Sequence, residues 1–346
     1  MKKVVVKIGS SVIATKGILD SSLVNRIIED ILSAEEQGVK VVLVTSGAIA
    51  CGLNKLGFKK RPQDTHSLMG IASLGQILLM DIYAEKFDKY KKLCAQILLT
   101  WDDFDNRKRF LNARYTINKL LNMGIVPIIN ENDAVSYEEI RFGDNDRLSA
   151  LVADLISAEM LVILSDVGGL MDGGKVIKVV SKIDSKIFSL VRKESKVFTA
   201  GGMSAKLEAA KISTSSGIKM VIASGKTKGA ITKIIKGQEL GTAFLPSNQI
   251  REARKRWIAF SKKTKGRIYV DDGAKDAILN RGKSLLSVGV IRIEGEFKKK
   301  DAVRIVDKEG NMVGCGLVNY SCEELKDCKG RKLDREVIHR DDFVAQ

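Results

Sequence analysis

Short apolar runs and helical stripes of apolar residues alternate along the first 250 residues of the chain. Runs rich in Val, Ile and Leu predict strands that are buried on both faces, whereas apolar residues spaced three and four apart predict amphipathic helices. Strands alternating with helices indicate an α/β fold, a three-layer αβα sandwich with a mainly parallel central sheet. The predicted strands cover residues 3–8, 39–44, 93–99, 125–129, 160–164 and 219–223, and the predicted helices cover about 21–37, 68–87, 107–123, 144–155, 200–216 and 229–235.

The pattern changes near residue 250, where short apolar runs separated by turns replace the long helical stripes. Such runs predict a small β-rich, barrel-like domain. We therefore expect one domain over residues 1–250 and a second over 251–346, with a basic linker at 251–256. The predicted elements of the second domain are strands at 257–260, 267–270, 290–297, 302–306 and 312–318 and a helix at 275–280.

Polar side chains follow several of the predicted strands of the first domain. Lys7, Ser46, Asn130 and the pair Ser165-Asp166 stand at or just beyond strand ends. The carboxyl ends of parallel strands meet at one edge of the sheet, which is where α/β folds bind ligands. These residues therefore predict a polar ligand site at that edge.

Two clusters of amides and carboxylates bracket a predicted hairpin near the middle of the chain, Asn130 to Asp133 and Asp144 to Asp146. Asn and Asp also favour turns and helix N-caps, and that alone would explain the second cluster. Both clusters around one hairpin are better explained by a binding site for a polar ligand.

Composition and charge narrow the class of protein. The net charge is +16, which favours anionic partners. Five scattered cysteines without a CxxC pair argue against a zinc or disulfide framework, and two histidines argue against a histidine base. We expect no membrane partner, because no apolar run reaches the ~18 residues of a membrane span. With no signal peptide expected at the N-terminus, a cytoplasmic location is predicted.

Neither common nucleotide motif is present. The P-loop pattern fails at Met220, and no G-x-G-x-x-G segment follows a predicted strand. Two glycine segments remain, Gly9-Ser10 after the first strand and Ala200 to Gly202 before a helix, each accompanied by a lysine, Lys7 and Lys206. Glycine lets backbone N–H groups approach phosphate closely, and lysine supplies a compact charge suited to phosphate.

Six runs occurring in order resemble the glutamate 5-kinases of the amino-acid kinase family. They are VVKIGSS (5–11), VTSGAIACG (44–52), RFLNAR (109–114), INENDAV (129–135), FGDNDRLSA (142–150) and GGMSAK (201–206). The tail, with Gly273, Asn280 to Leu286 and Gly289, resembles a PUA domain. The resemblance implies ATP-dependent phosphorylation of the side-chain carboxylate of L-glutamate, giving L-glutamyl 5-phosphate, the first step of proline biosynthesis.

The resemblance also implies a role for each matching residue. Lys7 and Lys206 are expected to contact the transferred phosphoryl group and Asp146 to orient both lysines. Ser46, Asp133 and Asn145 are expected to bind glutamate, with Asn130 and Asp144 close by. The expected nucleotide-binding residues are Lys7, Gly9, Ser10, Ser165, Asp166, Ala200, Gly201, Gly202, Met203, Ser204, Ala205 and Lys206.

Mg²⁺ is expected to arrive with ATP, held mainly by phosphates and water rather than by protein side chains. The sequence departs from the family pattern on the nucleotide side, where the segment after Asp166 is short and Ala200 replaces a common threonine. The resemblance further implies a homo-oligomer, dimeric or tetrameric, and feedback inhibition by proline.

Two alternatives stay open at this level. A sibling kinase with the same lysines would phosphorylate another acid, such as aspartate or carbamate. An RNA-binding protein would use the basic tail, where residues 251–346 hold 23 Lys and Arg against 16 Asp and Glu. The tail has few aromatic residues for base stacking, which argues against RNA.

Overall fold

The computed structural model describes residues 2–15, 18–136, 145–194, 200–247, 250, 252–327 and 333–345. The chain divides into two compact units, Met1–Ile250 and Arg251–Gln346.

The first unit is built on an eight-stranded sheet in the order β10-β12-β11-β7-β1-β4-β6-β5. Neighbouring strands are parallel except for β12, which is antiparallel to β11, so the predicted mainly parallel sheet is confirmed. The strands are β1 (Lys3–Ile8), β4 (Lys40–Val44), β5 (Cys94–Leu99), β6 (Val126–Glu131), β7 (Met160–Ser165), β10 (Val179–Val180), β11 (Lys219–Ser224) and β12 (Thr242–Phe244).

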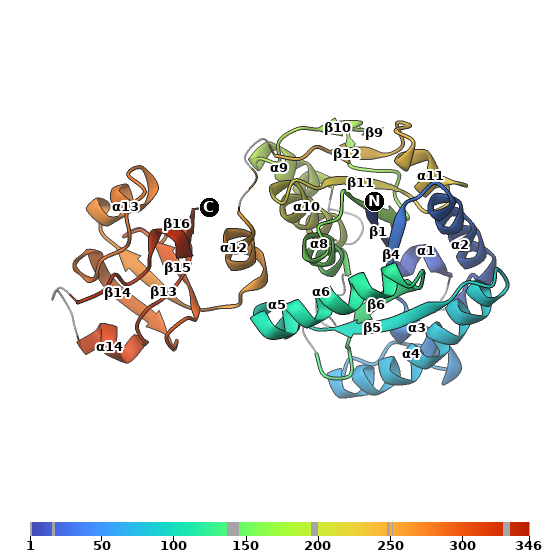
Figure 1. Cartoon of the computed structure of the whole chain (residues 1–346), viewed down its shortest axis with the longest axis horizontal. Helices are drawn as coiled ribbons and strands as arrows, with labels where there is room; N and C mark the ends of the chain where they lie inside the picture. Colours follow the sequence, from blue (N-terminus) through green and yellow to red (C-terminus); the bar gives the residue numbers. More distant parts are fainter. Residues whose placement is uncertain are drawn as a thin grey trace. The chain divides into compact units, whose positions relative to one another are not determined.

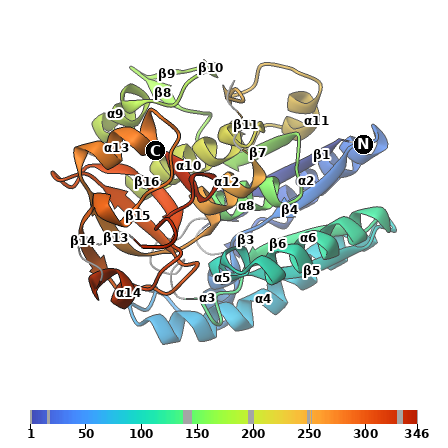
Figure 2. The ribbon, with the colours of Figure 1, turned by 60° about the vertical axis from the view of Figure 1, so that its left-hand side comes forward.

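Helices cover both faces of this sheet, as Figure 1 shows for α8 and α10 on one side and α2 and α11 on the other. The face that carries Val4, Val6 and Ile8 packs against α2 (Ser21–Glu36), α4 (Thr65–Asp88) and α11 (Ala230–Ile235). The opposite face is covered by α6 (Arg107–Asn122), α8 (Asn145–Leu155) and α10 (Ala200–Ser215). Figure 2 shows α6 lying along β5 and β6. Because side chains alternate along a strand, Val5 and Lys7 point to the α8 face.

The ends of α2 follow from local sequence. The Asp20 carboxylate accepts hydrogen bonds from the backbone N–H groups of Ser22 (3.0 Å) and Leu23 (3.0 Å), as an N-cap should. At the other end, Gly38 has φ of 78°, the left-handed conformation that commonly ends helices.

Several short elements are absent from the sequence-based prediction. In the first unit they include α1 (Ser10–Ile13), α3 (Ala48–Lys55), α5 (Trp101–Asp105), α9 (Ser185–Glu194), the short strands β10 and β12, and the small hairpins β2–β3 (Ala14–Thr15, Ile18–Leu19) and β8–β9 (Met171–Asp172, Lys175–Val176). The hairpin predicted between the two polar clusters falls mostly on 137–144, outside the described residues.

Helix α4 is long and, on average, apolar enough to cross a membrane by length and composition alone, and it is the one helix to be so among the residues described. Its Leu79, Tyr83 and Phe87 side chains are fully buried in the core shared with α2 and the sheet.

The second unit contains a five-stranded sheet in the order β14-β13-β15-β16-β17, mostly antiparallel, which confirms the predicted small β-rich domain. Its strands are β13 (Thr264–Val270), β14 (Val290–Gly295), β15 (Ala302–Val306), β16 (Met312–Leu317) and β17 (Phe343–Ala345). Its helices are α12 (Ala253–Arg256), α13 (Asp272–Leu279), α14 (Cys322–Asp327) and the short turns η2 (Ser287–Gly289) and η3 (Arg340–Asp342).

The predicted strand at 257–260 is wrong, because Trp257–Ser261 forms a single wide helical turn, η1, that continues α12. This turn buries Ile258 against Ala302, Leu317 and Val344. A four-residue apolar run fits a strand or a buried helical turn equally well, so periodicity could not decide between them.

Candidate active site

Lys7, at the end of β1, is the buried cation around which the site is built. Its side chain is 5% exposed, and its ammonium lies 2.5 Å from Asp146 Oδ1. Strand β1 sits between β7 and β4 in the middle of the sheet, so both of its neighbours hold Lys7 rigidly. A lysine in this position needs a nearby anion, because burying an unpaired ammonium is very costly.

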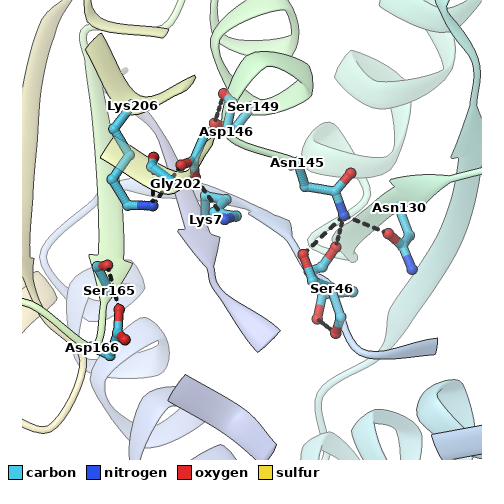
Figure 3. Close-up of polar contacts among 11 residues, drawn as sticks. Lys7, Ser46, Asn130, Asn145, Asp146, Ser149, Ser165, Asp166, Gly202 and Lys206 are labelled. Carbon is cyan, nitrogen blue, oxygen red and sulfur yellow. Dashed lines mark hydrogen bonds and ion pairs between the residues drawn. The ribbon is translucent and has the colours of Figure 1, made fainter. Parts of the chain in front are cut away.

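Asp146 receives a second lysine on its other oxygen. Lys206 Nζ lies 2.8 Å from Asp146 Oδ2, and it also donates to the Gly202 carbonyl at 3.3 Å. Figure 3 shows Lys7 and Lys206 reaching the same carboxylate. Asp146 is in the first turn of α8 and Lys206 in the second turn of α10, and these two helices pack side by side.

The electrostatics of this triad favour an anionic ligand. Burial alone would raise the pKa of Asp146, but the charges of Lys7 and Lys206 outweigh it and hold the pKa below its usual value. Two ammonium groups and one carboxylate sum to +1 in a region where all three side chains are largely buried. A phosphoryl group would balance this charge.

A second cluster centres on Asn145, the residue before Asp146. Its amide nitrogen contacts the Thr45 carbonyl (2.6 Å), Ser46 Oγ (3.0 Å) and Asn130 Oδ1 (2.7 Å). These contacts tie the start of α8 to the ends of β4 and β6. The Asn145 Oδ1 atom is buried and has no hydrogen-bond partner among the described residues, so it is available to accept from a ligand.

A pocket of about 170 Å³ adjoins this cluster. Four residues predicted to bind glutamate line it, Ser46, Asn130, Asp133 and Asn145; Asp144 lies outside the described residues. Burial raises the pKa of Asp133 to about 6, and the positive charge of Arg61 opposes that rise. The remaining lining residues are Ser10, Gly47, Ala48, Ile49, Ala50, Leu53 and Arg61.

The residues expected to face the nucleotide lie around the triad. Gly9 follows β1 and donates its backbone N–H to the Leu164 carbonyl at 3.1 Å. At the end of β7, Ser165 Oγ donates to Asp166 Oδ1 at 3.1 Å. Ala200, Gly201, Gly202, Met203, Ser204 and Ala205 form the first turns of α10, ahead of Lys206.

Ser10, which is predicted for the nucleotide alone, also lines the pocket with Asp133, so it stands between the two predicted subsites. Arg61 and the apolar wall of Ile49 and Leu53 were missed by sequence reasoning. The apolar residues belong to α3, a helix that sequence reasoning did not predict. Arg61 precedes a proline between α3 and α4, and a lone surface arginine gives no signal of a site.

Comparison with known proteins assigns both units to described families. The model of the amino acid kinase family matches residues 2–224, and the model of the PUA domain matches residues 266–340. The chain is 41% identical to a glutamate 5-kinase of Thermoanaerobacter sp. (strain X514) over 361 residues, which covers 99% of this chain and 97% of that protein. It is 43% identical to a glutamate 5-kinase of Syntrophotalea carbinolica over 364 residues, covering 100% and 98%.

Among solved structures, the chain is similar to carbamate kinase from Giardia lamblia bound to AMP-PNP, with a TM-score of 0.51 and 19% identity. The match covers 71% of this chain and 99% of that one. At this identity the likeness concerns the fold, and it agrees with the αβα sandwich described above.

Proposed function

Since the chain belongs to the amino acid kinase family and carries a PUA domain, we propose that this kinase transfers the γ-phosphoryl group of ATP to the side-chain carboxylate of L-glutamate. The product is L-glutamyl 5-phosphate, and the reaction is the first step of proline biosynthesis. The observation that carries the proposal is the buried Lys7–Asp146–Lys206 triad beside a pocket with both amide and carboxylate groups.

The acceptor needs no general base in this reaction. A glutamate side chain in water has a pKa of about 4.3 and is already ionised at neutral pH. The obstacle is instead the repulsion between an anionic nucleophile and the polyphosphate of ATP. Catalysis must therefore come from positioning the two anions and from cationic stabilisation of the phosphoryl group in flight.

Lys7 and Lys206 supply that stabilisation. Both ammonium groups are fixed on Asp146, at 2.5 and 2.8 Å, so their positions cost no reorganisation when charge develops on the phosphoryl oxygens. Lys7 approaches from β1 and Lys206 from α10. Asp146 is a positioning residue, because both of its oxygens are occupied by the lysines.

Mg²⁺ enters with ATP in this proposal and neutralises phosphate charge when bound. No group of three or more His, Cys, Asp or Glu that could hold a metal gathers within the described part of the chain. Asp146 is already engaged by two lysines. We assign the metal to the phosphates and water, because Mg²⁺ usually keeps several of its waters.

We also propose that proline inhibits the enzyme by occupying the glutamate pocket, because proline and glutamate share an α-carboxylate and a cationic nitrogen. Proline should raise the KM for glutamate without changing kcat. A fall in kcat at saturating glutamate would contradict a shared pocket.

We also propose that the protein forms a homo-oligomer, either a dimer or a tetramer. Strand β5 is at one edge of the described sheet, where backbone groups are open to pairing, and Leu93 just before it is 66% exposed. Light scattering of the purified protein measures the mass directly. A monomer at micromolar concentration would contradict this part alone.

The acceptor is tested by ADP release with a panel of acids at fixed ATP and Mg²⁺. The proposal predicts the highest kcat/KM with L-glutamate, and much lower values with L-aspartate and carbamate. Aspartate is one methylene shorter, so its carboxylate cannot reach the lysines while its amino group stays at Asp133. A higher kcat/KM with aspartate or carbamate would make the protein a sibling kinase of the same family.

A further inference from the structure

Arg61 lies in the connection between α3 and α4 and lines the pocket that contains Asp133. It is followed by Pro62, and the residue before a proline is restricted to extended backbone conformations. Its side chain is exposed to solvent, so the arginine stands where the pocket opens. The guanidinium of Arg61 therefore lies at the opening of the pocket, and the backbone that carries it is restricted by Pro62.

The pocket holds two opposite charges. Among its described lining residues, Arg61 is the one cation and Asp133 the one anion. Burial raises the pKa of Asp133, and the positive charge of Arg61 partly opposes that rise, so the two side chains interact electrostatically. Asp133 is 8% exposed, whereas Arg61 is exposed, so the anion lies deep and the cation lies near solvent.

This charge pattern matches the α-carbon end of an amino acid, which carries one ammonium and one carboxylate. The other lining residues are neutral, and Ser46, Asn130 and Asn145 among them can form hydrogen bonds. Ile49 and Leu53 supply an apolar surface for the methylene chain. The side-chain carboxylate of such a ligand would then be directed past Asn145 towards its neighbour Asp146 and the two lysines.

We propose that Arg61 binds the α-carboxylate of the acceptor amino acid opposite Asp133, which binds the α-amino group, and so selects α-amino acids over other acids. This inference rests on the proposed function and adds a specificity-determining residue to it. A guanidinium suits this task because it can donate two parallel hydrogen bonds to one carboxylate.

The α-carboxylate is remote from the reacting carboxylate, so its contact with Arg61 is equally strong before and during phosphoryl transfer. A contact of this kind lowers KM and leaves kcat unchanged. Loss of Arg61 should therefore appear in KM.

The experiment compares L-glutamate with L-isoglutamine, in which the α-carboxylate is a neutral amide. ADP release is measured for the wild type, Arg61→Ala and Arg61→Lys, with Lys60→Ala as the control. Lys60 is an exposed neighbour that does not line the pocket, and its removal makes the same change in net charge. Any general electrostatic effect on anionic substrates is therefore shared by both alanine variants.

Arg61→Ala should raise the KM for glutamate about tenfold, as expected for losing a hydrogen-bonded charge pair, and leave kcat near the wild-type value. The KM for isoglutamine should stay unchanged, so the preference for glutamate falls by about the same tenfold factor. Arg61→Lys should give an intermediate preference, and Lys60→Ala the wild-type preference.

The inference is overturned if Arg61→Ala keeps the wild-type preference for glutamate over isoglutamine, or if Lys60→Ala loses that preference equally. Wild-type protein that releases no ADP with glutamate would overturn the proposed function, and the inference with it. Wild-type activity with an unchanged preference in Arg61→Ala overturns the inference alone.

Discussion

At the scale of single residues, the site depends on one carboxylate that holds two lysines. Asp146 is fully buried and bonds Lys7 and Lys206 on separate oxygens. Removing its charge leaves two buried ammonium groups without their counter-ion, and breaking a buried pair in this way typically costs about 3–5 kcal/mol.

We therefore expect Asp146→Asn to lower the free energy of unfolding by about 3 kcal/mol or more. It should also lower kcat by at least about 100-fold, because the lysines lose their fixed positions. Urea unfolding and ADP release measure the two effects. Asp154→Asn, in the same helix, is the control; equal losses in both variants would mean that the effect is not specific to the triad.

The raised pKa of Asp133 predicts a pH dependence of substrate binding. Burial lifts this pKa to about 6, whereas the glutamate side chain stays ionised above its pKa of about 4.3. Protonated Asp133 cannot bind an ammonium group, so kcat/KM should fall about tenfold per pH unit below pH 6. The kcat/KM of Asp133→Asn should be low and show no such decline; a parallel decline in this variant would assign the pH effect to another group.

The same shift affects stability with the opposite sign. The folded-state pKa of Asp133 is raised above its ordinary value of 3.8, so between about pH 4 and 6 the folded protein binds more protons than the unfolded chain. Protonation of Asp133 therefore raises the free energy of unfolding as the pH falls from 6 to 4. Asp133→Asn should remove that contribution in urea unfolding.

At the scale of elements, the close approach of α3 and α4 shapes the pocket. A Cβ atom added to Gly75 of α4 would lie 1.7 Å from the Ala48 carbonyl oxygen at the start of α3. A Cβ atom added to Gly52 of α3 would likewise lie 2.1 Å from the Ile71 carbonyl oxygen. Only glycine permits this approach, which positions Ile49, Ala50 and Leu53 along the pocket.

We expect Gly75→Ala to push α3 away, lower the melting temperature and raise the KM for glutamate. The matched control is Gly70→Ala in the same helix, where nothing lies within 4 Å of the added Cβ. That control should stabilise the protein by up to about 1 kcal/mol, the difference in helix propensity. Similar effects of the two variants on KM would contradict the role given to the contact.

A second element-scale feature joins α2 to α11. The buried Asp30 carboxylate accepts the backbone N–H groups of Ile231 (2.7 Å) and Thr232 (3.0 Å), so a side chain 201 residues away caps α11. Asp30→Ala should cost roughly 2 kcal/mol in urea unfolding, because two buried donors lose their partner. Asp20→Ala, at an exposed N-cap, should cost only about 1 kcal/mol. A smaller loss in Asp30→Ala than in Asp20→Ala would contradict this account.

Much of this arrangement could be predicted from local sequence, and the reasons are physical. Lys7, near the end of an otherwise apolar strand, indicated a cation at the edge of the sheet. Polar residues at strand ends indicated one edge of the sheet, where Lys7, Ser46, Asn130 and Ser165 lie near one another (Figure 3). The six sequence runs together indicated the amino acid kinase family, and the comparisons confirm this family.

Other features depend on contacts that local patterns do not encode. Helix α3 begins after Gly47, which offers no capping side chain, and contains Gly52, so its start gave no signal. Strands β10 and β12 have two and three residues, too few for periodicity. The role proposed for Arg61 depends on the fold, which brings it to the same pocket as Asp133.

At the scale of the whole molecule, every described residue of the triad and pocket belongs to the first unit, and the second unit has its own core around Ile268, Val303 and Val337. A chain of residues 1–250 should therefore fold and release ADP with glutamate and ATP. Circular dichroism and the ADP assay measure both properties. A folded fragment without activity would show that the second unit is needed for catalysis.

The most direct test of the central claim is trapping the product with hydroxylamine, which converts an acyl phosphate to a hydroxamate. Wild-type protein with ATP, Mg²⁺ and L-glutamate should form γ-glutamyl hydroxamate in step with ADP, and folded Lys206→Ala protein should form almost none. ADP release without hydroxamate, or equal hydroxamate formation by Lys206→Ala, would contradict transfer of the phosphoryl group to the glutamate carboxylate between the two lysines.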